Sequence, residues 1–269
     1  MNVSMQDGWN LGWKLGAVLS GRANESLLDT YSEERQVIAK NLIDFDREWS
    51  TLMATPQDKL PDPKYLEDFY VKTAEFPAGF MTEYQPSLIT AGTEHQDLAA
   101  GYPVGKRFKS ARVMRVCDAT RCTRSPGHRG RPLAHPRLRG PRRGRRGIGD
   151  VALRRVAAER SQVPAGCLSP RGDDDATLFD VDVTYQQQYT DMDVTQVPRV
   201  FRPQIGPLEL NYWERVYATL PDEDIYEERQ ISRDGAVVVV RPDHYVAAVL
   251  PLDATGELAS FFEGVLTKK

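Results

Sequence analysis

The chain has 269 residues, 41% of them hydrophobic, and a formal net charge of −3. Its three cysteines are too few for a disulfide framework, which indicates a reducing, cytoplasmic setting. No apolar run approaches the ~18 residues of a membrane-spanning helix. The N-terminus carries Asp7 and no early positive charge, which excludes a secretion signal. We therefore expect a cytoplasmic protein with no part in a membrane.

Residues 1–20 have the periodicity of a helix, because residues of one kind recur every four positions. The stripes are small (Ser4, Gly8, Gly12, Gly16, Ser20), aromatic and methionine (Met1, Met5, Trp9, Trp13), aliphatic (Leu11, Leu15, Leu19) and polar (Asn2, Gln6, Asn10, Lys14). Two apolar stripes beside a small one predict a mostly buried helix. An interior glycine costs roughly 0.5–1 kcal/mol relative to alanine, so we expect another backbone or a ligand to approach the small stripe closely.

Two further helices are predicted downstream. The first begins between Ser26 and Thr30, where Ser, Asp and Thr offer caps, and continues on an apolar face with a spacing of three to four residues. That face comprises Val37, Ile38, Leu42, Phe45, Trp49 and Leu52. Residues 55–63 contain three prolines and predict a break, after which residues 64–74 predict a shorter helix.

The C-terminal end predicts two strands and a helix. Asp234–Gly235 is a hairpin turn signal, and the β-branched run 236–240 predicts a buried strand. Residues 241–244 turn the chain, so that 245–250 would pair back antiparallel. A final helix capped by Asp253 or Thr255 carries an apolar face of Leu258, Phe261, Phe262, Val265 and Leu266.

An arginine-rich segment interrupts this pattern. Residues 121–172 contain 14 Arg, no Lys and two acidic residues. The rest of the chain therefore has 21 basic and 36 acidic residues, which gives it a net charge of about −15. Many Gly and Pro and no strand alternation favour disorder, with only 151–158 weakly helical. The segment could be an anion-binding or nucleic-acid-binding arm, a zinc site, or out-of-frame translation of a GC-rich gene.

The third interpretation fits best. Aromatic residues for base stacking are absent from the arm, so we expect no nucleic-acid partner. The zinc candidates have unsuitable spacing (Cys117, Cys122, His128, His135), and we expect no metal site. If central strands were lost here, the terminal hairpin would lack a sheet partner and the C-terminal domain would be poorly packed.

Four blocks of the sequence resemble one enzyme family. They are MNVSMQDGWNLGWKL (1–15), YSEERQVIAKNLIDFDREWS (31–50), GYPVGKRFKSARVMRVCDAT (101–120) and GAVVVVRPDHYVAAVLPLDATGELASFF (235–262). Together they resemble the C-terminal part of FAD-dependent aromatic hydroxylases of the phenol 2-monooxygenase and 3-hydroxybenzoate 4-monooxygenase type. The resemblance covers residues 1–120 and 173–269.

The resemblance implies an α/β fold in two parts. Residues 1–80 would be the C-terminal helices of the FAD-binding domain. Residues 81–269 would form a thioredoxin-like dimerisation domain, disrupted by the Arg-rich segment 121–172. Cys117 and Cys122 are spaced C-x4-C, so thioredoxin redox chemistry is not expected.

The family's activity implies FAD, NADPH as cosubstrate, O2, a phenolic substrate and a homodimer. The backbone of Met1 and Asn2 would meet the flavin pyrimidine edge, where a helix N-terminus stabilises negative charge. The family's catalytic residues lie upstream of Met1, so none is assigned and the chain is expected to be inactive as a hydroxylase. The alternative is a non-catalytic dimerisation or interaction module. Structural roles are expected for Asp7 and Asn10, a turn for His244, and packing or interface roles for Tyr185, Tyr189, Tyr212 and Tyr217.

Overall fold

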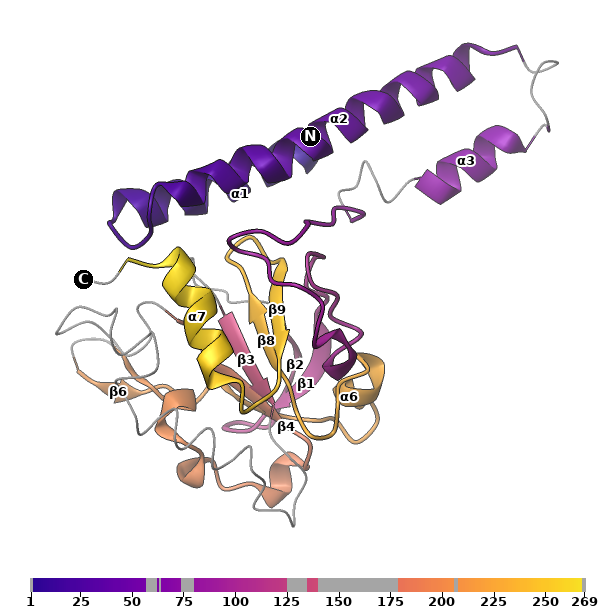
Figure 1. Cartoon of the computed structure of the whole chain (residues 1–269). Coiled ribbons are helices and arrows are strands. Elements are labelled where there is room, and N and C mark those ends of the chain that lie inside the picture. The colour runs from indigo at the N-terminus through magenta and orange to yellow at the C-terminus, as the bar shows by residue number, and fades with distance from the viewer. Residues whose placement is uncertain are drawn as a thin grey trace.

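A computed structural model describes residues 2–56, 62, 64–73, 80–124, 135–139, 179–205 and 208–267. A layer of helices lies across one end of a domain built on a mixed β-sheet (Figure 1). Mixed helix and sheet of this kind confirm the predicted α/β class. The boundary between the two parts near residue 80, and the thioredoxin-like character of the second, stay predictions.

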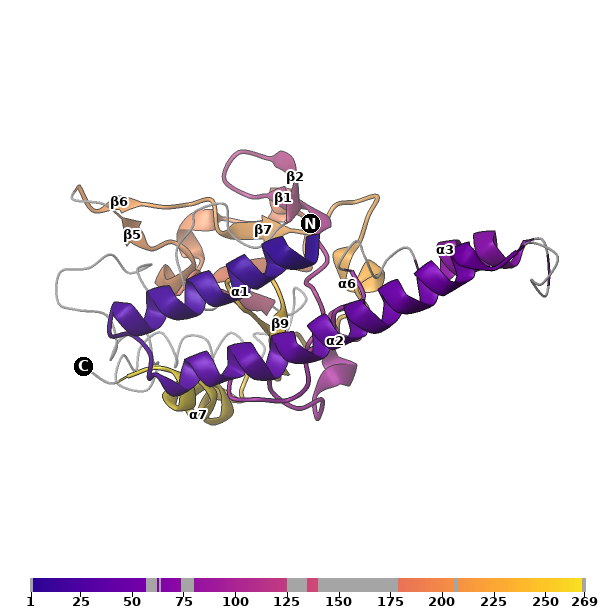
Figure 2. The same ribbon diagram turned by 90° about the horizontal axis from the view of Figure 1, so that it is seen from above.

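Three helices make up the first part. They are α1 (Asn2–Leu19), α2 (Ser26–Ala54) and α3 (Tyr65–Thr73), as the periodicity predicts. The N-cap of α2 is Glu25 and makes no side-chain capping hydrogen bond, so the predicted Ser, Asp or Thr cap is wrong. The C-terminal half of α2 extends beyond the body of the molecule, with α3 folded back along it (Figure 2). Stacked rings join the two helices, with centroids 5.8 Å apart for Trp49 and Phe69.

Among the described residues, the main sheet has seven strands in the order β2-β1-β7-β4-β3-β8-β9. Its strands are β1 (Ala111–Arg115), β2 (Thr120–Arg124), β3 (His135–Arg139), β4 (Asp182–Tyr185), β7 (Val216–Ala218), β8 (Val237–Val240) and β9 (Val246–Leu250). A separate two-stranded ribbon pairs β5 (Gln204–Ile205) with β6 (Leu210–Asn211). Helices α6 (Ile225–Glu228) and α7 (Thr255–Val265) accompany short 3-10 turns at Gln96–Leu98, Tyr189–Asp191, Val194–Gln196 and Arg199–Phe201.

Strand β8 divides two hydrophobic cores. All four of its valines are buried, as the continuous β-branched run predicts. Val237 and Val239 point into the core that also holds Trp13 of α1 and Phe262 of α7. Val238 and Val240 point to the opposite side, because successive side chains of a strand alternate between faces. The first core therefore joins the helical layer to the sheet.

Two stretches of the segment 121–172, residues 121–124 and 135–139, are described and form strands, which differs from the expected lack of strands there. Strand β2 reaches into this segment and β3 lies within it. Strand β3 pairs antiparallel with β8 and parallel with β4, so the terminal hairpin has a sheet partner. The domain is accordingly packed, while residues 125–134 and 140–178 lie outside the described residues.

The C-terminal elements follow the sequence closely, with two differences. Asp234–Gly235 does form a turn, with Gly235 at a positive φ of 93°, but it leads into β8 and does not connect two paired strands. Helix α7 has Ala254 as its N-cap, without a side-chain capping hydrogen bond, so neither Asp253 nor Thr255 is the cap. The register of β8 and β9 is antiparallel, as predicted.

Removing the aromatic ring that anchors α7 should destabilise the domain strongly. Phe262 is 4% exposed and packs edge-on against Phe179 at 4.7 Å. We expect Phe262→Ala to lower the free energy of unfolding by about 3–5 kcal/mol through a buried cavity. Urea denaturation followed by circular dichroism measures this. Phe69→Ala, on the projecting arm, serves as the control; an equal loss in both variants would contradict this account of the core.

Candidate functional site

The N-terminus of α1 is the position at which the sequence predicts cofactor contact. Helix α1 begins at Asn2, which is exposed, and its first turn contains no acidic residue. A helix N-terminus presents backbone N–H groups and the positive end of the helix dipole. This end of α1 therefore fits an anionic edge of a ligand. Met1, the other predicted contact, lies outside the described residues.

Helix α1 faces the domain with its polar side. Asn10 and Lys14 are 1% and 0% exposed, and the neighbouring Trp13 and Ala17 are also buried. The aliphatic and methionine side chains largely point outward, so the prediction of a mostly buried helix is wrong for this chain. A buried amine and amide require polar partners, because transfer of an unpaired polar group from water is unfavourable. Those partners come from α2 and from the β8–β9 turn.

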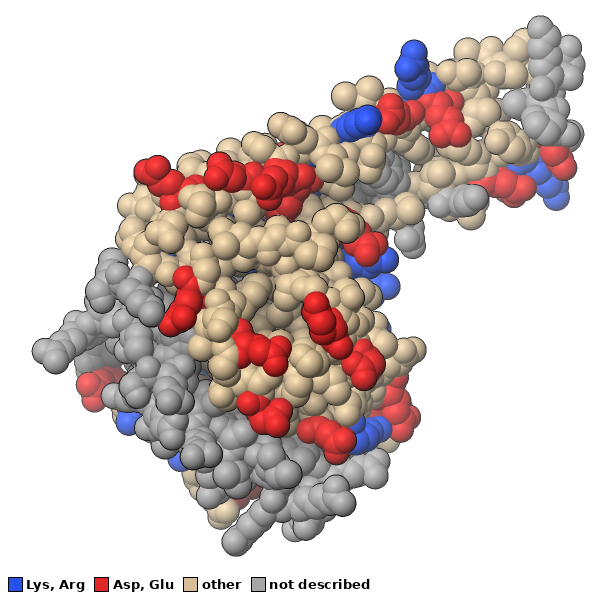
Figure 3. Space-filling model, in the orientation of Figure 1, with Lys and Arg blue, Asp and Glu red and all other residues tan. Residues whose placement is uncertain are grey.

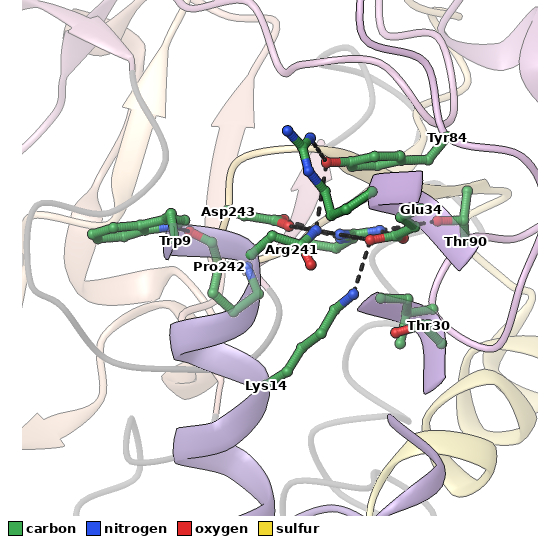
Figure 4. A network of polar contacts seen from close by, with 12 residues as sticks. Trp9, Lys14, Thr30, Glu34, Tyr84, Thr90, Arg241, Pro242 and Asp243 are labelled. Atoms are coloured by element: carbon green, nitrogen blue, oxygen red, sulfur yellow. Dashed lines mark hydrogen bonds and ion pairs between the residues drawn. The ribbon is translucent and has the colours of Figure 1, made fainter. Parts of the chain in front are cut away.

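Glu34 of α2 is the centre of a buried ionic cluster (Figure 4). Its Oε2 accepts from Nζ of Lys14 at 2.9 Å, from Nη2 of Arg241 at 2.9 Å and from Nδ2 of Asn10 at 2.8 Å. Oε1 accepts from Nη1 of Arg241, which makes the pair bidentate. Arg241 also donates to both carboxylate oxygens of Asp243, at 3.0 and 2.6 Å. One guanidinium thus ties α2 to the β8–β9 turn.

A second group of contacts extends the cluster toward the start of α1. Nε of Arg35 donates to Oδ1 of Asp7 at 2.5 Å, and its Nη1 donates to the Tyr84 hydroxyl at 3.0 Å. Asn10 donates to Asp243 at 3.2 Å. Asp7 is partly open to solvent, since its side chain retains 37% of its exposure. The first two turns of α1 are therefore held by α2 and the domain together.

Aromatic rings enclose the charged groups. The Arg241 guanidinium lies 4.8 Å from the ring centroid of Tyr84 and 5.8 Å from those of Trp13 and Tyr245. Cation–π attraction is stronger where water is excluded, so these rings stabilise the arginine in place of solvent. Outside the cluster, the Trp9 indole donates to the carbonyl oxygen of Pro242 at 2.9 Å.

The charges shift the ionisation of the two central groups. Burial lowers the pKa of Lys14 from 10.5 to about 8, although Glu34 opposes the shift. Burial alone would raise the pKa of Glu34, but Arg241 and Lys14 lower it below its usual range. Near neutral pH the cluster therefore holds an ionised carboxylate between two cations. Charges held in this way fix the position of α1.

The structural roles predicted for Asp7 and Asn10 agree with these contacts. His244 lies in the β8–β9 turn with a φ of 71° and meets Trp9 edge-on at 6.3 Å. The four tyrosines are packing or surface residues: Tyr217 is 7% exposed, Tyr185 and Tyr189 pack against the cores, and Tyr212 bonds to Glu214. Of the zinc candidates, His128 lies outside the described residues, and the part of the chain that the structure describes holds no metal-binding group of three.

Sequence reasoning missed the cluster as a unit. Glu34 and Arg35 lie in the block YSEER and Arg241 and Asp243 in RPDHY, both of which contributed only to the family resemblance. The available signal was the polar stripe of α1, which places Asn10 and Lys14 on one side of the helix. No helix among the described residues is long and apolar enough to cross a bilayer.

Removing the central arginine should destabilise the protein strongly. Arg241→Ala leaves the carboxylates of Glu34 and Asp243 buried without their main partner, which typically costs about 3–5 kcal/mol. Urea denaturation of Arg241→Ala and of Arg112→Ala gives the comparison. Arg112 pairs with Glu223 on the surface and should cost less than about 1 kcal/mol. Similar losses in both variants would mean that the cluster contributes no more than a surface ion pair.

Lys14 should give stability a distinct alkaline pH dependence. The pKa of Lys14 is about 8 in the folded protein and 10.5 in the unfolded chain. Between pH 8 and pH 10.5 the unfolded chain therefore binds more protons than the folded protein. The free energy of unfolding should therefore rise from pH 8 to pH 10.5 on account of Lys14. The difference between the parent and Lys14→Met, measured by urea denaturation at each pH, isolates this effect. A difference that is flat or falls over this interval would show that Lys14 is not buried as an amine.

Comparison with known protein families matches both parts of the chain. The family described as phenol hydroxylase, C-terminal dimerisation domain, matches residues 82–125 and 153–269. A FAD binding domain matches residues 1–46. Residues 126–152 lie between the two matched stretches of the dimerisation domain. This gap is shorter than residues 121–172, the segment that the sequence analysis left outside the family resemblance.

Individual relatives are flavin-dependent monooxygenases. The chain is 40% identical to a 3-hydroxybenzoate 4-monooxygenase of Comamonas testosteroni over 99% of its own length and 43% of the relative's. It is 31% identical to a phenol 2-monooxygenase of Aspergillus fumigatus over 98% of its length and 44% of the relative's. The chain thus spans less than half the length of these relatives.

Solved structures show the same fold. The flavin-dependent monooxygenase PieE, in complex with FAD and substrate, matches with a TM-score of 0.55 at 18% identity, over 97% of this chain and 43% of that one. Aklavinone-11 hydroxylase, in a ternary complex with FAD and aklavinone, matches with a TM-score of 0.52 at 19% identity, over 97% and 39%. The family match, the relatives and the fold agree: this chain belongs to the phenol hydroxylase family of FAD-dependent aromatic hydroxylases.

Proposed function

We propose that the chain is the C-terminal part of a cytoplasmic FAD-dependent monooxygenase that hydroxylates a phenolic ring with NADPH and O2. The observation that carries this proposal is the FAD-binding match on residues 1–46, which includes α1 and two of the buried charged residues that hold it, Lys14 and Glu34. The names of the relatives support a phenolic or related aromatic substrate.

In this proposal α1 meets the flavin at its N-terminus. The backbone of Met1 and Asn2 would donate to the pyrimidine edge of the isoalloxazine, where the helix dipole favours negative charge. Bound FAD would supply the oxygen chemistry. Lys14, Glu34 and Arg241 would hold α1 in register with the rest of the protein, because their contacts fix the helix against the sheet.

The second part of the chain would form a homodimer. The dimerisation match covers the second core and the part of the first core that lies in the sheet domain, so the residues that pack this domain are present in the chain. This same observation favours a second candidate, in which the chain is a non-catalytic dimerisation module and α1 and α2 serve only to complete its core. The two candidates differ in whether the chain binds flavin.

A flavin titration separates the candidates. If α1 binds the flavin, the chain should quench FAD fluorescence, and Asn2→Asp should weaken binding of reduced flavin about 2–5-fold through repulsion at the helix N-terminus. Gln36→Glu, which adds the same charge on an exposed position of α2, is the matched control. Absence of any quenching favours the module.

Activity gives a second readout of the same proposal. The chain spans less than half the length of its relatives, so we expect no phenol-dependent NADPH oxidation by the purified chain. Phenol-stimulated loss of NADPH absorbance would contradict the expectation that the groups that bind and activate the phenol lie outside this sequence.

A further inference from the structure

The β5–β6 ribbon lies apart from both hydrophobic cores. Its strands, Gln204–Ile205 and Leu210–Asn211, pair only with each other among the described residues and form a sheet of their own. No described residue of the ribbon is a member of either core or packs against one. The ribbon lies at the outer margin of the molecule, at the left of Figure 2. Because an isolated two-stranded ribbon is only marginally stable in water, this element gains little from the packing described so far.

The tip of the ribbon exposes two leucines. Leu208, in the turn, retains 77% of its exposure, and Leu210, at the start of β6, retains 62%. Exposed apolar side chains that are scattered singly are common on protein surfaces. Two large ones beside each other, at the tip of an element that supports no core, favour an interaction site.

The backbone between the two leucines is strained. Glu209 adopts the left-handed conformation with a φ of 50°, which glycine tolerates and which is unfavourable for a residue with a side chain. Strain of this kind is typical of functional positions, where the surroundings hold the backbone in place. The shape of the tip is therefore a specific feature of the ribbon.

The base of the ribbon is firmly attached to the domain. The Tyr212 N–H donates to the carbonyl oxygen of Pro203 at 2.8 Å, which continues the pairing beyond the two strands. The Arg202 guanidinium lies 5.5 Å from the ring centroid of Trp213. Next to this pair, Phe201 is completely buried in the first core. The domain therefore supports the ribbon at its base and presents the leucines outward.

We propose that the β5–β6 ribbon is the element through which the C-terminal domain contacts a second copy of the chain. The inference rests on the homodimer of the proposed function and specifies which surface forms it. The ribbon lies within 153–269, the longer stretch of the dimerisation match, and that match singles out no surface. In a two-fold symmetric dimer, the ribbon of each copy would pack against the other copy.

Charge favours the ribbon as the contact between two copies. Acidic side chains are spread over the face of the molecule shown in Figure 3, and basic ones are fewer. Two such faces repel each other when identical copies meet. Residues 204–211 contain a single charged residue, Glu209. A contact made by the leucines of the ribbon avoids most of that repulsion.

The double variant Leu208→Lys/Leu210→Lys tests the proposal. The dissociation constant of the dimer is measured by analytical ultracentrifugation of the full chain over a series of protein concentrations. It should rise at least ~10-fold, which corresponds to about 1.4 kcal/mol, because two ammonium groups would lose water against the partner copy. Far-UV circular dichroism should not change, because both side chains are exposed in the single chain.

Two further variants serve as controls. Leu19→Lys changes a leucine that is 83% exposed at the end of α1, outside the dimerisation match, and should leave the dissociation constant unchanged. Leu210→Met keeps an apolar side chain of similar volume at the tip and should retain the dimer.

Three outcomes would overturn the proposal. A dimer with the same dissociation constant in the parent and the double variant would exclude the ribbon while the homodimer itself stands. A parent chain that is monomeric at every concentration would exclude both. Equal weakening by Leu19→Lys would show that added positive charge, and not its position, causes the loss. Flavin binding is a separate measurement, so its failure would count against the flavin part of the proposed function alone.

Discussion

The bidentate pair between Arg241 and Glu34 is the contact on which the arrangement of this protein depends. It joins a helix near the N-terminus to a turn near the C-terminus, across 207 positions of the sequence. The buried carboxylates of Glu34 and Asp243 and the buried cations of Lys14, Arg35 and Arg241 would each pay a large desolvation penalty if they left water separately. They are accommodated together, because Asn10 and the Tyr84 hydroxyl supply hydrogen bonds, and the rings of Tyr84, Trp13 and Tyr245 supply the polarisable surface that water would otherwise provide.

This cluster fixes which side of α1 faces inward. Lys14 and Asn10 must reach Glu34, so the polar stripe turns toward the sheet domain and the apolar stripes turn away. The same packing holds the N-terminus of α1 where a flavin contact is proposed, and leaves Gly8, Gly12 and Gly16 on the exposed side of the helix. The orientation of α1 is therefore a consequence of one buried set of charges.

The β8–β9 hairpin connects the cluster to the core of the domain. Its first strand, β8, pairs with β3, and the turn between β8 and β9 carries Arg241 and Asp243. His244 adopts a left-handed backbone conformation in this turn, which directs the chain back into β9. The turn is thus held by the sheet beneath it and by α1 and α2 above it, so movement of either part must disturb the ion pairs.

The sequence by itself determined the elements whose signal is local. The three helices, the valine strand and the final helix follow from periodicity, and the family follows from blocks such as the one that contains Trp13 and Lys14. Only the tertiary structure decided which face of α1 is buried, and that β3 completes the sheet inside the Arg-rich segment. Both depend on partners that are distant in sequence. Periodicity defines the faces of a helix, but the charged residues of the neighbouring elements determine which face is buried.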